Sequence, residues 1–352
     1  MTDPTKYRLS KWVSSRVRDN DVLLVHDDLV VISGLKGKAR ELHYLLTLPE
    51  FTTADLISLL GENAARTMLR ELTSMKAIRE TSDATSPAHL SHQVSYFEAL
   101  THEPEQYQNA ISSSRVAIVG IGGIGGVILQ HLLGAGVKDF LLIDGDVVSA
   151  SNMNRQFLYR PTDVGRKKLD VVDDLLAGYP DVNALLIPEF IESIEQLQRI
   201  DWLPDFVVGA ADEPVGLIQG WLREYAWENG AGYLSCGVGV HRGSWGPLIM
   251  PGVTPCPDCT ARWLASISGT VEQSPRQNKR PLTASFGPLN SVVGAAAAAD
   301  VILTLAGDAT QNRADSIRTV SLLYPAIKKI PRPALPYSCN RSGCELSTDK
   351  VD

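Results

Sequence analysis

The chain has 352 residues, of which 44% are hydrophobic and 21% are charged, and its formal net charge is −7. A chain of this length can bury a large core without disulfides, and we expect about two domains. These values exclude a disordered chain and a small disulfide-bonded scaffold, and the acidic balance argues against nucleic acid as a partner.

The first 80 residues predict a small separate domain. The chain begins without the apolar run of a secretory signal, so we expect a cytoplasmic protein. Two apolar runs in residues 21–32 flank His26-Asp27-Asp28 and predict a β-hairpin. Helical patterns follow at about 39–48, 53–60 and 63–75, with Thr52 or Thr53 as a candidate N-cap. A hairpin with three short helices is typical of a winged-helix-like module. The 12 basic and 11 acidic residues of this domain are too balanced to favour DNA binding.

Residues 81–110 are predicted to form a linker and a lead-in segment, because residues 81–92 are polar and have no periodicity. The remainder, residues 111–352, predicts an α/β domain. Apolar runs at 115–119, 139–143 and 205–209 alternate with helical patterns. This alternation is typical of a mostly parallel, doubly wound sheet.

Two further segments of the second domain differ from this pattern. Residues 268–283 predict a long mobile loop, and the alanine-rich residues 291–305 predict a buried helix. The most apolar part of that helix, residues 292–299, ends at Asp300 and is too short to span a bilayer. We therefore expect no association with a membrane.

A glycine-rich loop follows the first predicted strand of this domain. The run Gly120-Ile-Gly122-Gly123-Ile-Gly125 matches G-x-G-x-x-G and lies between a strand and a helix. Such glycines let the backbone approach a phosphate, and the helix N-terminus offers free N–H groups. Asp144 ends the next strand, where a carboxylate can accept hydrogen bonds from a ribose. A nicotinamide or flavin dehydrogenase and a glycine turn without a ligand are both compatible with this loop alone.

The segment after Asp144 argues against a dehydrogenase. The segment Ser151-Asn152-Met-Asn-Arg155-Gln156 follows the strand end and includes the Asn152 amide, the Arg155 guanidinium and the Gln156 amide. Lys168 comes after it. A dinucleotide pyrophosphate needs mostly backbone donors. Attack on the α-phosphorus of a triphosphate instead builds negative charge that Arg and Lys stabilise.

Asp212 ends a third strand at the same edge of the sheet. A carboxylate there can hold Mg²⁺ together with phosphate and water oxygens. Each of these residues also has an ordinary structural explanation. Arg155 and Lys168 can be solvated surface charges, and Asp212 can be the N-cap of a helix over residues 213–226.

Four of the five cysteines form two close pairs. Cys256 and Cys259 form a C-x-x-C, and Cys339 and Cys344 follow about 80 residues later. In a cytosolic chain such pairs favour a metal site, with a disulfide or an empty site as the alternatives. Cys236 stands apart at a predicted strand end, where it is either a packed core thiol or a nucleophile.

Together these elements, between about residues 115 and 345, resemble the E1-like adenylating family, which activates ubiquitin-like proteins and sulfur carriers. The resemblance implies a Rossmann-like sheet, a homodimer, and adenylation of a carboxylate by Mg-ATP with release of pyrophosphate. It implies that Asp144 binds the ribose and that Asp212 holds Mg²⁺. It assigns Gly120, Gly122, Gly123, Gly125, Ser151, Asn152, Arg155, Gln156 and Lys168 to the rest of the ATP site. The cysteines Cys256, Cys259, Cys339 and Cys344 are then a structural zinc site.

The chain is most similar to the peptide-modifying branch of that family, which includes the enzymes of microcin C and pantocin A synthesis. Two blocks carry this likeness, Pro251-Gly-x-x-x-Cys256-x-x-Cys259 and Ser285-Phe-Gly-Pro-Leu-Asn290. The likeness implies that residues 1–80 bind the leader of a ribosomally made precursor peptide, as an added strand or in a strand–helix groove. We therefore expect adenylation of a peptide carboxylate followed by intramolecular dehydration and cyclisation. Retention of AMP on the peptide, and activation of a ubiquitin-like or sulfur-carrier protein, stay open as alternatives.

The sequence departs from the family in three places. Four residues separate Cys339 from Cys344, where two are usual, although this spacing is still compatible with zinc. The Arg-x-x-Arg that reaches a partner's active site aligns with His89-Leu-Ser-His92. The predicted loop 268–283 has no cysteine, which disfavours thioester chemistry. Its Arg276, Lys279 and Arg280 contact an acidic peptide or are simply solvated.

Overall fold

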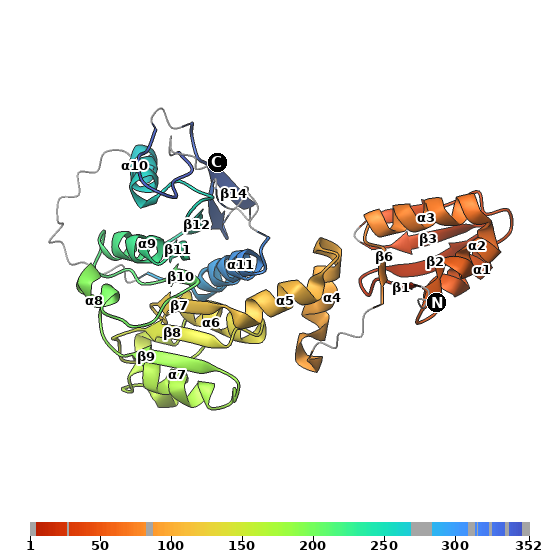
Figure 1. The fold of residues 1–352 in the computed structure, drawn as a ribbon. Coiled ribbons are helices and arrows are strands. Elements are labelled where there is room, and N and C mark those ends of the chain that lie inside the picture. Colours follow the sequence, from red (N-terminus) through yellow and green to blue (C-terminus); the bar gives the residue numbers. More distant parts are fainter. Residues whose placement is uncertain are drawn as a thin grey trace. The chain divides into compact units, whose positions relative to one another are not determined.

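The structure is a computed structural model that describes residues 5–26, 28–81, 87–268, 284–308, 314, 316–323, 326–334 and 338–346. The chain separates into two compact units, residues 1–109 and 110–352 (Figure 1). Each unit has a sheet framework of its own, and each is described separately below.

The N-terminal unit contains the predicted hairpin and helices. Strands β2 (Ser14–Arg18), β3 (Asp21–Val25) and β4 (Leu29–Ile32) form an antiparallel sheet in the order β2-β3-β4. Helices α1 (Ala39–Thr47), α2 (Thr53–Leu60) and α3 (Glu62–Ser74) follow. Helix α2 begins with a capping box, in which the Thr52 hydroxyl accepts from the Asp55 backbone N–H and the Asp55 carboxylate accepts from the Thr52 backbone N–H. The hairpin at residues 21–32, the three helices and the Thr52 cap are therefore confirmed.

A second sheet of this unit escaped the sequence analysis. Its order is β5-β1-β6, from β1 (Lys6–Leu9), β5 (Phe51–Thr52) and β6 (Ile78–Glu80). These strands have two to four residues each and come from distant parts of the chain. Strands this short contain too few residues to show an alternating hydrophobic pattern. They are defined by hydrogen bonds to partners from distant parts of the chain.

Helices begin near the end of the predicted linker and occupy most of the predicted lead-in segment. A 3-10 helix covers Ala88–Leu90, and α4 (Ser91–Leu100) and α5 (Pro104–Ser113) follow. The buried Glu98 carboxylate on α4 makes contacts that stabilise this helix. It pairs with Arg8 at 2.5 Å and Arg79 at 3.3 Å, and accepts from the Lys11 backbone N–H at 2.8 Å. This network attaches α4 to the β5-β1-β6 sheet.

The second unit is built on one large sheet in the order β14-β13-β12-β11-β10-β7-β8-β9 (Figure 1). Five strands run parallel: β7 (Arg115–Val119), β8 (Asp139–Ile143), β9 (Asn183–Ile187), β10 (Phe206–Gly209) and β11 (Gly232–Val238). The predicted doubly wound, mostly parallel sheet is confirmed. Three antiparallel strands extend its other side: β12 (Gly243–Ile249), β13 (Ser316–Ser321) and β14 (Ala326–Pro331).

The helices of this unit are α6 (Gly125–Gly134), α7 (Lys168–Leu176), α8 (Ile194–Gln198), α9 (Ile218–Glu228), α10 (Pro257–Ser268) and α11 (Gly287–Leu305). The strand order reverses between β7 and β10. From β7 the chain adds β8 and β9 on one side of the sheet and then β10 and β11 on the other. Doubly wound sheets bind ligands at the carboxyl ends of the two strands where this reversal occurs.

The prediction made for the apolar stretch in helix α11 needs a correction. With 19 residues the helix is long and apolar enough to cross a membrane, contrary to the expectation that the stretch is too short. However, the helix packs against α6, β11 and β12, and half of its apolar stretch is buried. Its Asp300 accepts from the Trp245 indole at 2.8 Å and pairs with Arg318 at 2.5 Å. We therefore assign α11 to the core of the second unit.

Candidate active site

A cavity of about 440 Å³ opens at the carboxyl ends of β7, β8 and β10. This volume falls within the range of about 300–1,000 Å³ that small-molecule sites occupy. Its wall contains most of the residues that the sequence singled out: Gly120, Gly122, Gly123, Asp144, Asn152, Arg155, Gln156, Lys168 and Asp212. Gly125 and Ser151 are not among the described residues that line it.

The glycine loop connects β7 to α6, and close backbone packing demands glycine in it. Gly120 has φ of +92°, and a Cβ there would lie 2.6 Å from the Ala211 nitrogen. A Cβ on Gly125 would lie 1.9 Å from the Gly120 carbonyl oxygen. Gly125 therefore packs behind the loop, which explains why it does not line the cavity.

Asp144 and Lys168 form a buried ion pair in the wall of the cavity. The Lys168 ammonium lies 3.3 Å from Asp144 Oδ2 and 2.7 Å from Asp146 Oδ2. The side chains of Lys168 and Asp144 are 4% and 6% exposed, whereas that of Asp146 is 53% exposed. Asp144 also accepts from the Ile121 backbone N–H at 2.6 Å. Lys168 is therefore not the solvated surface charge that the alternative reading required.

The segment after β8 places one cation and two amides along the same wall. Arg155 donates from Nη1 to the Ser151 carbonyl at 2.7 Å and to Asn154 Oδ1 at 3.1 Å. Asn152 is buried, and its Oδ1 accepts from the Ser149 backbone N–H at 3.0 Å. Gln156 is buried too, and its Oε1 has no hydrogen-bond partner among the described residues. An unpaired buried amide oxygen in a cavity wall can accept from a hydrogen-bond donor on a ligand.

Asp212 lies exposed in the cavity wall, just past the end of β10. Helix α9 begins only at Ile218, with Leu217 as its N-cap residue. The alternative that Asp212 caps a helix over residues 213–226 is therefore wrong. A hydrogen bond fixes the backbone before Asp212: Gln219 donates from Nε2 to the Ala211 carbonyl at 2.6 Å.

Several residues of the cavity wall were missed by the sequence analysis. They include Asp146, Glu189, Phe190, Ser285 and Asn290. Asp146 stands two residues after Asp144, so the signal was present. Ser285 and Asn290 belong to a block that supported the resemblance but received no role. Glu189 and Phe190 follow β9 and carried no recognisable pattern.

Cys236 on β11 also lines the cavity. It is buried, and its thiol lies 3.7 Å from the Gly209 carbonyl oxygen. Burial raises the pKa of the Cys236 thiol to about 12. At neutral pH the sulfur is therefore protonated and is a poor nucleophile.

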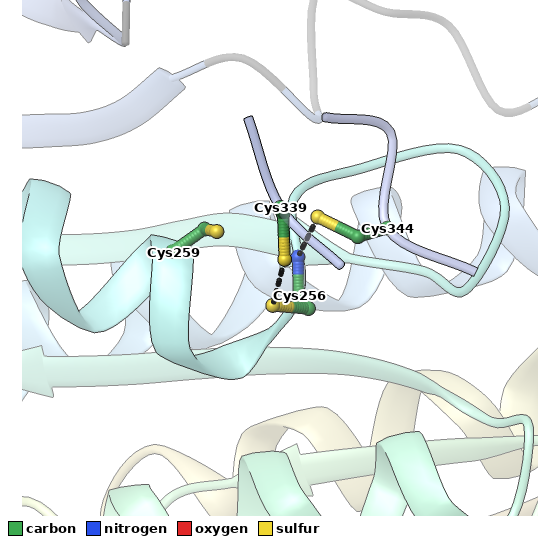
Figure 2. Close-up of side chains that lie close together, drawn as sticks. All are labelled: Cys256, Cys259, Cys339 and Cys344. Atoms are coloured by element: carbon green, nitrogen blue, oxygen red, sulfur yellow. Dashed lines mark hydrogen bonds between the residues drawn. The ribbon is translucent and has the colours of Figure 1, made fainter. Parts of the chain in front are cut away.

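The two cysteine pairs meet beside α10 (Figure 2), and none of the four is among the residues that line the cavity. Cys256 precedes the helix, Cys259 lies on it, and Cys339 and Cys344 come from the C-terminal segment. Their four Sγ atoms lie within 4.8 Å of one another, and the Sγ atoms of Cys256 and Cys339 are 3.8 Å apart. Tetrahedral zinc with Zn–S bonds of about 2.3 Å needs sulfurs about 3.8 Å apart.

The chemistry of this cluster also fits a metal. All five cysteines lie in the described part of the chain, and none forms a disulfide. Backbone N–H groups point at two of the sulfurs, from Cys256 to Cys344 at 3.3 Å and from Arg341 to Cys339 at 3.4 Å. The Arg341 N–H holds the pKa of the Cys339 thiol below its ordinary value. Such N–H groups stabilise thiolates, the form in which cysteine binds zinc.

Two sequence predictions lie outside this site. His89 is on the 3-10 helix and His92 on α4, both in the N-terminal unit. The predicted loop 268–283, with Arg276, Lys279 and Arg280, falls outside the described residues except for Ser268 at the end of α10.

Comparison with known proteins identifies the family. The model of the ThiF family matches residues 91–341, well over half of the chain. The chain belongs to the ThiF family. This membership confirms the family that the glycine loop, Asp144, Arg155 and the cysteine pairs predicted. The match begins at α4, so it includes the helices that precede the large sheet.

Two curated relatives of this ThiF-family chain are molybdopterin-synthase adenylyltransferases. The one from Salmonella typhimurium is 44% identical over 70 residues, which is 20% of this chain and 28% of the relative. The one from Escherichia coli K12 is 42% identical over 85 residues, 22% of this chain and 34% of the relative. The matched part of the chain thus spans about a third of the length of these relatives.

Solved structures match the ThiF-family chain over nearly its whole length. Escherichia coli MccB with ATP superposes with a TM-score of 0.79 at 22% identity, over 97% of this chain and 99% of MccB. The microcin C7 biosynthetic enzyme MccB in complex with N-formylated MccA gives a TM-score of 0.80 at 23% identity over the same shares. PaaA gives 0.71 at 21% identity, over 92% of this chain and 100% of PaaA. At such identities the likeness shows the fold.

Proposed function

We propose that this ThiF-family chain matures a ribosomally made precursor peptide by ATP-dependent adenylation of a peptide carboxylate, followed by dehydration and cyclisation. The observation that carries the proposal is the cavity itself. It combines a glycine loop, a strand-end carboxylate and two cations at the point where a doubly wound sheet binds nucleotides.

The roles follow from charge and position. Asp144 accepts from the ribose, while the N–H groups of the glycine loop and of the Asn152 and Gln156 side-chain amides donate to phosphate oxygens. A peptide carboxylate attacks the α-phosphorus, a new P–O bond forms, the bond to the β-phosphate oxygen breaks, and pyrophosphate leaves. Arg155 and Lys168 stabilise the negative charge that builds on the α-phosphate oxygens. In the second step an amide nitrogen or a carbon nucleophile of the same peptide attacks the acyl carbon, loses its proton and displaces AMP.

Two metals belong to this proposal. Asp212 offers an exposed carboxylate oxygen to Mg²⁺, which prefers one or two carboxylates together with phosphate and water oxygens. The cysteine cluster would hold zinc in a closed coordination shell, which leaves no open position for a substrate. Zinc would therefore stabilise the C-terminal segment rather than take part in the reaction.

The N-terminal unit would bind the leader of the precursor. In the sheet β2-β3-β4, strand β4 is an edge, and its Leu29 and Val31 are 54% and 43% exposed. An edge strand with exposed apolar side chains can accept a peptide as an added strand. Val31→Glu should weaken peptide binding, whereas Met75→Glu, an exposed apolar residue outside the sheets, should not. Equal binding by both variants would exclude β4 as the docking strand.

One alternative ending is stable transfer of AMP to the peptide. It is favoured by the likeness over nearly the full chain to MccB, which has been solved with ATP and with MccA. Activation of a ubiquitin-like or sulfur-carrier protein is a second alternative, favoured by the molybdopterin-synthase adenylyltransferases among the relatives. If thioester formation were part of that activity, the protonated Cys236 thiol would be a poor nucleophile for it.

The deciding experiment is incubation of the purified protein with candidate precursor peptides and ATP, read by mass spectrometry. Cyclisation predicts a peptide lighter by one water, and stable transfer predicts a peptide heavier by an adenylyl group. Lys168→Gln should abolish both, while Lys167→Gln, the exposed neighbour at the N-cap of α7, should not. If no peptide changes and only a protein with a C-terminal Gly-Gly triggers pyrophosphate exchange, the carrier-activation alternative is correct.

We also propose that the protein acts as a cytoplasmic homodimer. Any contact of His89 or His92 with a partner's ATP, in place of the family's Arg-x-x-Arg, depends on this. Light scattering of the purified protein measures its mass in solution, and a monomer at micromolar concentration would contradict the proposal.

A further inference from the structure

A buried tyrosine forms a hydrogen bond with the backbone of the glycine loop. Tyr159 follows the amide-rich segment of the cavity wall and is 5% exposed. Its hydroxyl donates to the Ile121 carbonyl at 2.7 Å. Tyr159 was not among the residues that the sequence singled out, and it does not itself line the cavity.

The Ile121 carbonyl shares a peptide unit with the Gly122 N–H. In a planar trans peptide these two groups point in opposite directions. Because the carbonyl faces the buried Tyr159 hydroxyl, the Gly122 N–H must face away from it. Gly122 lines the cavity, and its N–H has no hydrogen-bond partner among the described residues.

The preceding peptide unit is held as well. The Ile121 N–H donates to Asp144 Oδ2 at 2.6 Å. Two successive peptide units are thus fixed by two buried side chains, one acceptor and one donor. A loop of glycines has many accessible conformations, so such fixed contacts are needed to give it a single orientation.

We infer that Tyr159 is a positioning residue whose hydroxyl orients the Gly122 N–H toward a phosphate group of the bound nucleotide. The inference rests on the proposed ATP site. The hydroxyl can only donate while it is protonated. Burial, together with the charges of Asp144 and Asp146, raises the pKa of Tyr159, so it remains a donor at any physiological pH.

The test is Tyr159→Phe, which removes the hydroxyl and keeps the ring. Without the donor, only a fraction of loops hold the binding conformation, and the apparent affinity falls by that fraction. We expect ATP binding to weaken roughly tenfold by calorimetry, because a lost buried hydrogen bond is typically worth about that factor. Adenosine has no phosphate, so its affinity should change less than about twofold. A purely structural defect would weaken ATP and adenosine alike.

A matched control exists in the same unit. Tyr225 also donates from a largely buried hydroxyl to a carbonyl, that of Trp202 at 3.0 Å, and it does not line the cavity. Tyr225→Phe should leave ATP binding unchanged. Hydrogen exchange measured without ligand should show faster exchange in residues 120–126 for Tyr159→Phe only.

The outcomes separate this inference from the proposed function. If the wild-type protein does not bind ATP, the proposed function fails, and the exchange measurement still reports whether Tyr159 orders the loop. If the wild type binds ATP and Tyr159→Phe binds it equally well with unchanged exchange, Tyr159 is not a positioning residue.

Discussion

The buried pair of Lys168 and Asp144 leads to a prediction about stability in the absence of any ligand. Replacing Lys168 by Met removes the ammonium between two carboxylates. Asp144 then loses its buried cationic partner, and backbone N–H groups are its remaining donors. Breaking a buried pair from one side costs about 3–5 kcal/mol, because the other charge stays desolvated and uncompensated.

The second partner of Lys168 provides the comparison. Asp146 lies closer to Lys168 than Asp144 does, but its side chain is 53% exposed. An ion pair that includes such an exposed group contributes about 0–1 kcal/mol. Burial rather than distance should therefore decide the ranking, and Asp146→Asn should lower the free energy of unfolding by about 1 kcal/mol or less.

Thermal unfolding followed by tryptophan fluorescence can measure this difference. Five of the six tryptophans lie in the second unit, and only Trp12 lies in the first. For a unit of this size each kcal/mol shifts Tm by about 2–4 °C. We expect Lys168→Met to lower Tm by roughly 6–20 °C, and Asp146→Asn by less than about 4 °C. Equal shifts for the two variants would refute the reasoning from burial.

Three further predictions concern other parts of the second unit. Gly120→Ala should destabilise the protein strongly, because its Cβ would lie 2.6 Å from a backbone nitrogen at positive φ; Gly134→Ala, at a helix end with open space, should leave Tm unchanged or raised. Cys339→Ser should abolish the zinc content found by elemental analysis, while Cys236→Ser keeps it; equal zinc in both would exclude the cluster. Native Cys236 should resist iodoacetamide at pH 8. Because its folded pKa of about 12 lies above the ordinary value of 9, its contribution to stability is complete below pH 9 and decreases as the pH rises toward 12. Fast labelling of the native thiol would contradict the buried assignment.

The helices and central strands were predictable because their signals are local. The apolar runs at 115–119 and 139–143 became β7 and β8, and the helical pattern at 53–60 became α2 with its Thr52 cap. The order of these signals along the chain also predicted a doubly wound sheet. By contrast, the polar segment 81–92 has no local signal. Helix α4, which begins at Ser91, is stabilised by contacts of Glu98 with Arg8 and Arg79. These partners lie far from Glu98 in the sequence, so no local pattern reveals the contacts.

The composition of the site was largely accessible from the sequence, and its electrostatics were not. The glycine motif, Asp144, Arg155, Lys168 and Asp212 all line one cavity because the carboxyl ends of parallel strands meet at one edge. The sequence could not indicate that Lys168 is buried between two carboxylates, or that Gln156 has an unpaired oxygen.

The sequence by itself determined the family, the α/β class and the two close cysteine pairs, because residue type and spacing carry that information. Only the tertiary structure decided which charges are buried, which backbone groups face the cavity, and that Tyr159 supports the glycine loop. These properties depend on residues far apart in the chain that meet only when β7, β8 and β10 align. A hydrogen bond between residues 121 and 159 has no signature in the spacing of either one.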